Sequence, residues 1–195
     1  MKGMMHGSVV SPMPTGFGRP AWRHTASAHR GSACPVQAMM KGFISYAHKD
    51  HAVLERLLEH LRPMERTLHL TFWHDKHIDA GHRWNDEIEK AIDAAEVFIL
   101  LASPAFMASP FIVGKEIPAI KKQRRKCRGV VIPVLVRACA WQLELGAIQA
   151  VPRGKDGAWP IERWNPRNDG YDTARQQIDT AICKHFGLRP RQRQW

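Results

Sequence analysis

Glu116 is the residue of this chain best placed to do chemistry, because it is the only acid between Glu96 and Glu144. It follows the apolar run 97–102 (VFILLA) across two Ser-Pro steps. A short run that is apolar throughout indicates a strand buried on both faces, and Glu116 is then expected in the helix that follows it. Open α/β sheets bind ligands outside the carboxyl ends of their strands. A lone carboxylate at that edge is therefore a candidate for ligand binding or catalysis.

A second group of ionisable residues lies in the segment 74–83, where His74, His77 and His82 alternate with Asp75 and Asp79. Histidine and carboxylate side chains are common zinc ligands. Their spacing here matches no helix-borne ligand set, and histidines in loops are usually solvated. We expect no metal site and a solvated loop hinged at a glycine.

Length and composition indicate one soluble domain, with 195 residues, 44% hydrophobic and 24% charged residues. The net charge of +11 is concentrated partly in the runs 121–128 and 184–195. Such a balance can attract nucleic acid, anionic lipid or phosphate compounds. Because the first run stops at the apolar segment 129–136, we interpret it as the solvated end of a helix, where cations favour the dipole. No nucleic-acid-binding motif is present, and nucleic acid is not an expected partner.

The four cysteines fit neither a metal site nor a disulfide framework; they are Cys34, Cys127, Cys139 and Cys183. A chain of this size does not need disulfides for stability, so we expect a reducing, cytoplasmic setting. No apolar window approaches the ~20 residues that a transmembrane helix requires, and no membrane association is expected.

Three segments follow from the change of composition along the chain. Residues 1–40 contain no acid and no helical or strand period, which predicts disorder, or a translation start nearer the Met39-Met40 pair. A folded domain is predicted over 41–186, and the last nine residues, 187–195, form a basic tail.

Inside that domain, apolar runs alternate with segments of helical period. Asp50 is a good helix N-cap, Pro63 should help to end the first helix, and Pro118 should bend or interrupt the helix that carries Glu116. The strands are expected at 42–46, 68–73, 97–102 and 129–136, with a weak last strand at Pro160-Ile161, and the helices at 51–61, 84–95, around Glu116 and at 171–186. The run at 68–73 alternates, which is typical of a strand nearer the sheet edge. This order predicts a doubly wound α/β fold with a parallel sheet and helices on both faces.

With these elements placed, the order of motifs resembles that of the TIR domain in its bacterial form. Phe43-Ile44-Ser45-Tyr46 followed by 47–50 is similar to the family's first box. Asp75 and Ile78-Asp79-Ala80-Gly81 are similar to the loop after the second strand, and Leu101-Ala102-Ser103-Pro104 through Ser109 to Glu116 to the third-strand signature. The resemblance covers residues 41–186 and implies a flavodoxin-like fold with five parallel strands.

The resemblance also implies a reaction. Enzymes of the family cleave the nicotinamide–ribose bond of NAD+ and depend on a glutamate at the position of Glu116. Nicotinamide is a cationic leaving group that needs no general acid, so one carboxylate can suffice to stabilise an oxocarbenium-like ribose. The residues carried over as NAD+ contacts are Tyr46, Ala47, His48 and Asp79, with Ser109 near the catalytic helix. Ile112 stands where many enzymatic members have Trp or Cys, which predicts a more aliphatic wall.

Two functions of different class are consistent with this resemblance. The first is an NAD+ nucleosidase, with NAD+ as substrate and no cofactor, that releases nicotinamide and ADP-ribose or a cyclic derivative. By analogy, such a protein would act in anti-phage defence by making a nucleotide signal for a separate effector. The alternative is a non-enzymatic module that assembles with other TIR domains, which are expected partners in either case.

Overall fold

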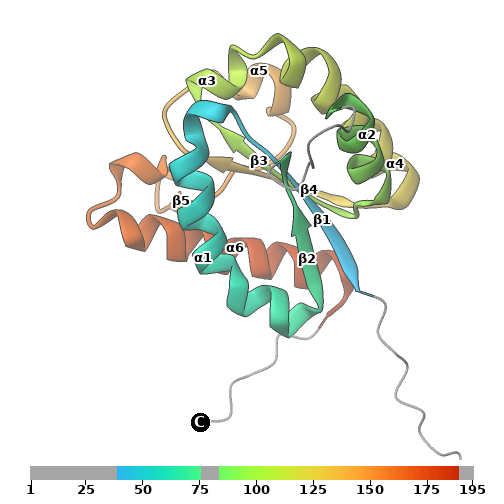
Figure 1. Cartoon of the computed structure of the whole chain (residues 1–195). Helices are drawn as coiled ribbons and strands as arrows, with labels where there is room; N and C mark the ends of the chain where they lie inside the picture. The colour runs from blue at the N-terminus through green and yellow to red at the C-terminus, as the bar shows by residue number, and fades with distance from the viewer. Residues whose placement is uncertain (1–38, 76–83, 189–195) are drawn as a thin grey trace, which may run out of the picture. The chain divides into compact units, whose positions relative to one another are not determined.

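A four-stranded parallel sheet forms the centre of the domain in the computed structural model, which describes residues 39–75 and 84–188. The strand order is β2-β1-β3-β4 (Figure 1), and the strands are β1 (Met40–Ser45), β2 (Leu70–Trp73), β3 (Val97–Ala102) and β4 (Val130–Leu135). All neighbouring strands pair in parallel, in the register Gly42↔Val97 and Val97↔Val130. The predicted α/β fold is confirmed, and the alternating strand lies at the sheet edge as β2.

Helices cover both faces of this sheet (Figure 1). They are α1 (His51–Leu68), α2 (Trp84–Ala94), α3 (Pro104–Met107), α4 (Ile117–Cys127), α5 (Gln142–Leu145) and α6 (Arg167–Phe186), with short 3-10 turns η1 (His48–Asp50) and η4 (Ile161–Arg163). Helices α1 and α6 pack on one face, and α2 to α5 pack on the other. None of the helices in the described ranges is long and apolar enough to cross a bilayer.

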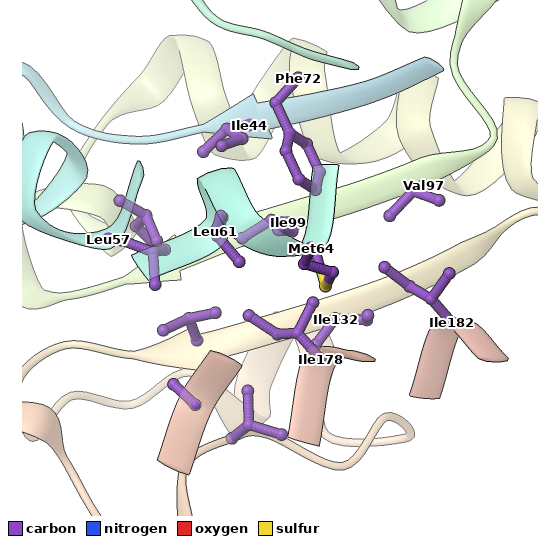
Figure 2. Packing of buried hydrophobic residues seen from close by; sticks show 14 of the residues in the cluster. Ile44, Leu57, Leu61, Met64, Phe72, Val97, Ile99, Ile132, Ile178 and Ile182 are labelled. Atoms are coloured by element: carbon purple, nitrogen blue, oxygen red, sulfur yellow. The ribbon is translucent and has the colours of Figure 1, made fainter. Parts of the chain in front are cut away.

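The core consists of two apolar layers separated by β3, whose six residues are all buried. Alternate residues of β3 point to opposite faces, so Ile99 packs with α1 and α6 and Phe98 packs with α2 and α4. Figure 2 shows the first layer, in which Leu57 and Leu61 of α1 face the strands. Full burial of such side chains stabilises the fold by about 1.5–3 kcal/mol each. This packing fixes the carboxyl ends of β1 and β3 next to each other.

The fifth parallel strand is reduced to a single bridge. Val151 pairs with Val134 of β4 in parallel, and no ladder extends from that pair in the described part of the chain. The predicted weak strand at Pro160-Ile161 is wrong, because Ile161 begins the η4 turn. A separate antiparallel pair, β5 (Arg153–Gly154) with β6 (Gly157–Ala158), follows the bridge. Prolines at 152 and 160, which lack the N–H that a ladder needs, bracket this region.

Pro63 does not end the first helix, contrary to the sequence prediction. Helix α1 continues to Leu68, and His69 in the left-handed conformation caps it. Both residues that follow the proline on the inner face, Met64 and Leu68, are buried against the sheet. Their burial outweighs the hydrogen bond that the missing N–H of Pro63 costs.

Asp50 is not a side-chain cap of α1 either. Its carboxylate is completely buried and accepts hydrogen bonds from Ser103 after β3 and from Arg137 after β4, the latter at 2.5 Å. Ser103 in turn caps α3 by accepting from Phe106 N at 3.1 Å. The carboxylate thus ties together the loops that follow three neighbouring strands, a role that outweighs helix capping because a buried carboxylate requires charge-compensating partners.

Candidate functional site

A cavity of about 400 Å³ opens where β1, β2 and β3 end, at the carboxyl edge of the sheet. Its volume lies in the range of small-molecule sites. Five of the six site residues expected from the sequence line it, together with residues that the sequence did not single out. The lining is formed by Phe43, Ile44, Ser45, Tyr46, Ala47, His48, Lys49, Trp73, Asp75, Ile88, Ala105, Ala108, Ser109, Phe111, Ile112 and Glu116. Asp79, the sixth, lies outside the described residues, as do His77 and His82.

Glu116 reaches the cavity from a π-helical turn, Ile112–Glu116, that runs directly into α4. In this wider turn the N–H of Ile117 bonds to the carbonyl of Ile112, five residues back. Pro118 follows in the first turn of α4, where its missing N–H is tolerated. The π turn thus interrupts the α-helical hydrogen bonding directly before Pro118. Such turns are frequent at functional sites.

The carboxylate of Glu116 is nearly removed from solvent, with 7% of the residue exposed. Its Oε2 accepts a hydrogen bond from Ser45 Oγ at the end of β1. Burial raises the pKa of Glu116 to about 7; the Ser45 bond opposes this rise, and the charge of Asp75 adds to it. Near neutral pH the group therefore divides between acid and carboxylate, which is the condition of many active-site acids.

Tyr46 follows Ser45 and lines the same cavity, with its hydroxyl donating to Asp75 Oδ1 after β2. The side chain is buried, and burial, with the bonded carboxylate beside it, raises the pKa of the phenol. The hydroxyl is thus a neutral donor at physiological pH. This bond joins the ends of the two strands β1 and β2, and both of its residues line the cavity.

The other three residues expected from the sequence, Ala47, His48 and Ser109, also line the cavity. Ala47 is buried, and its carbonyl accepts from Asp50 N at 2.7 Å, whereas His48 is exposed at the rim. Ser109 is half-buried, and its Oγ accepts from Ile112 N at 3.3 Å, so it caps the turn that carries Glu116. We infer that Ser109 acts on the site by holding this turn.

Aromatic and aliphatic side chains form the apolar part of the wall. Phe43 and Trp73 stack with ring centroids 5.4 Å apart, and Phe111 and Ile88 also line the cavity. Ile112 is buried in the lining, where an aliphatic wall was expected. A flat ring of a ligand would be accommodated against this apolar wall, and hydroxyl groups of a ligand would find the polar groups of Ser45, Asp75 and Glu116.

Ser45 and Asp75 belong to the motifs quoted from the sequence but, like Trp73, were not assigned to the site. Asp75 carried a usable signal, since it is the first acid after a strand that was expected at the edge of the sheet. His74 departs from its interpretation as a solvated loop residue, because it is buried. Its neighbour Asp75 lines the cavity, so residues 74 and 75 pack against the rest of the domain.

Comparison with known proteins places most of the chain in one family. Residues 43–181 match the model described as TIR domain. Over 146 residues the chain is 32% identical to the uncharacterized protein y4lF of Sinorhizobium fredii (strain NBRC 101917 / NGR234), aligning 74% of this chain and 43% of that protein. The chain therefore spans less than half the length of that relative. It also aligns with the TIR domains in the activated Roq1 resistosome directly recognizing the pathogen effector XopQ, at 15% identity and a TM-score of 0.43, covering 72% of this chain and 84% of that one.

Proposed function

The chain belongs to the TIR domain family, and from this premise we propose that it is an NAD+ nucleosidase with Glu116 as its catalytic carboxylate. The observation that carries the proposal is the position of Glu116 itself. It is a buried carboxylate in a cavity at the carboxyl edge of the sheet, held by Ser45 and facing an aromatic wall. Its charge is available where a positively charged sugar would form.

The proposed reaction breaks the bond between the nicotinamide nitrogen and C1 of the ribose. The bonding electron pair leaves with nicotinamide, which becomes neutral, and positive charge develops on the ribose ring. Ionised Glu116 stabilises that charge, and its low-polarity surroundings strengthen the attraction. Water then adds to C1 and loses a proton to give ADP-ribose, or a group of the same molecule adds to give a cyclic product.

The remaining residues have assignable roles in this scheme. Trp73, which stacks on the buried ring of Phe43, offers an aromatic surface to the nicotinamide ring. Tyr46 donates its hydroxyl to Asp75, which holds the two cavity-lining residues together. His48 and Lys49, exposed at the rim, offer donors to the pyrophosphate of NAD+. Asp79 keeps its proposed role as an NAD+ contact.

Incubation of the purified full chain with NAD+ at high protein concentration tests the proposal. We expect the wild type to release nicotinamide, measured by mass spectrometry together with ADP-ribose or its cyclic form. Glu116→Ala should reduce this rate by at least about a hundredfold, whereas Glu59→Gln, on the exposed side of α1, should keep it. Equal inactivity of wild type and Glu116→Ala would reject the enzyme and favour the interaction module.

The pH dependence of the reaction is a second test. Because only ionised Glu116 stabilises the cationic ribose, kcat/KM should rise with pH and level off above about 7. Ser45→Ala removes the bond that lowers the pKa of Glu116, so the midpoint should move upward, with several-fold lower kcat/KM at pH 7 and recovery at higher pH. Ser109→Ala removes a hydroxyl that bonds a backbone N–H, and the midpoint should stay in place. An unshifted midpoint in Ser45→Ala would reject the positioning role of Ser45.

We further propose a cytoplasmic setting in which several copies associate with one another or with other TIR domains. In that setting the ADP-ribose product would act as a signal for a separate effector in anti-phage defence. This extension rests on family analogy.

A further inference from the structure

Helix α4 presents a row of cations that the proposed reaction does not use. Five basic residues in α4 or at its C-cap are exposed, and none forms an ion pair with another described residue. They are Lys122, Arg124, Arg125, Lys126 and Arg128. Lys121, half-buried, is instead paired with Glu144 at 3.7 Å. Lys122, Arg125 and Lys126 lie on one side of the helix, since three and four residues separate neighbours on a helix surface.

Helix α2 presents the opposite charge. Asp86, Glu89 and Asp93 are exposed on one side of it and form no ion pair within the described residues. Lys90, a basic residue on this helix, forms an ion pair with Glu87, with Nζ and Oε1 2.9 Å apart. An acidic row and a basic row therefore lie on two separate helices.

The two helices are neighbours on the same face of the sheet (Figure 1). Gln123 of α4 donates to the carbonyl of Asp93 at 2.6 Å, and Glu89 and Ala119 line one small hollow between the helices. Each helix connects two parallel strands, so both run in the same direction. Lys122 consequently lies at a level between Glu89 and Asp93 along the helix axes.

We propose that this face is an interface between two copies of the chain, with α2 of each copy against α4 of the other. The twofold axis would run parallel to the helices, outside the surface and level with the space between them. Rotation about it places α2 of one copy over α4 of the other, with the same direction and at the same level. The acidic row of each copy then meets the basic row of its partner, and the same contact occurs twice. Lys122 would lie between Glu89 and Asp93 of the other copy, and Arg125 beside Asp93. Exposed Ala94 and Pro118 leave room for the helices to approach.

Charge complementarity favours a second copy over nucleic acid as the occupant. A polyanion would be attracted by α4 but repelled by the acidic row next to it, whereas a rotated copy matches both rows. The net charge of +11 on each chain opposes association at long range. At physiological salt, charges more than about 8 Å apart are largely screened, so the close pairs decide. This interface specifies the self-association proposed above, and it does not depend on NAD+ cleavage.

A charge exchange tests this interface by analytical ultracentrifugation of the full chain in about 0.15 M salt, after removal of nucleic acid. The wild type should show a mass that rises with concentration toward twice the monomer. Glu89→Lys with Asp93→Lys, and separately Lys122→Glu with Arg125→Glu, should each weaken dimerisation at least about tenfold, because like charges then face each other. Mixed in equal amounts, the two variants should form a heterodimer of nearly wild-type affinity, since both contacts regain opposite charges.

The control is Arg62→Glu with Arg66→Glu, which makes the same charge change as Lys122→Glu with Arg125→Glu but on the exposed side of α1, and it should leave dimerisation intact. A wild type that stays monomeric up to several hundred micromolar would overturn the interface. So would association that requires nucleic acid, or a mixture that fails to restore the dimer. Circular dichroism of each variant separates loss of association from loss of folding. Because the readout is mass, failure here is distinguishable from failure of the NAD+ assay.

Discussion

Replacing Glu116 with glutamine should raise the free energy of unfolding by roughly 3 kcal/mol at pH 8, even though it removes the proposed catalytic group. In the folded protein burial raises the pKa of this carboxyl to about 7, whereas the unfolded chain leaves it in its ordinary range near 4.5. Each pH unit between the two values corresponds to about 1.4 kcal/mol of cost for the ionised form. Glutamine avoids that cost and retains an oxygen that can accept from Ser45.

The sign of this effect depends on pH. The folded state binds the proton more tightly, so Glu116 lowers stability as pH rises from about 4.5 to about 7, and the loss is complete above that. The difference between Glu116→Gln and wild type should therefore be largest at pH 8 and fall below about 1 kcal/mol at pH 5. Urea unfolding at the two pH values measures it. A difference independent of pH would contradict a displaced pKa, and Glu59→Gln, at an exposed site, should show little change.

The parts of the fold that sequence predicted well are those decided by local apolar pattern. Runs such as 97–102 and 129–136 are strands because every residue is apolar, and they are buried on both faces as β3 and β4. The position of Glu116 followed from the same reasoning, since the helix that follows a central parallel strand begins near the carboxyl edge of the sheet. Its partner Ser45 is 71 residues away in sequence, and that distance hides the contact from any local pattern.

The errors concern residues whose role is decided by tertiary contacts. Pro63 lies inside α1 because Met64 and Leu68 are buried beyond it, and Asp50 binds Arg137 and Ser103 instead of its own helix. The single bridge at Val151 is preceded by an apolar segment broken by Gln149 and followed by Pro152, so the pattern alone did not locate a fifth strand there.

Removing Arg137 should be more destabilising than removing the acid that it contacts, with a loss of about 3–5 kcal/mol for Arg137→Met. The reason is the unequal burial of the pair. Asp50 is completely buried, whereas the side chain of Arg137 is 42% exposed and also lies 3.8 Å from Glu162. Without Arg137 the carboxylate keeps only the Ser103 hydroxyl. Without the carboxylate, Arg137 still reaches water and Glu162.

Asp50→Asn should therefore cost less, on the order of 2 kcal/mol, since it leaves no unpaired buried charge. In the double variant the two losses should not add, because Arg137→Met no longer leaves a carboxylate unpaired when residue 50 is an amide. Urea unfolding of the four proteins gives this coupling directly. Additive losses, or a larger loss for Asp50→Asn than for Arg137→Met, would contradict the assignment.

The same substitution should also affect the proposed reaction. Asp50 directly follows His48 and Lys49, which line the Glu116 cavity, so Arg137→Met should lower kcat/KM. Arg62→Met, on the exposed side of α1, should not.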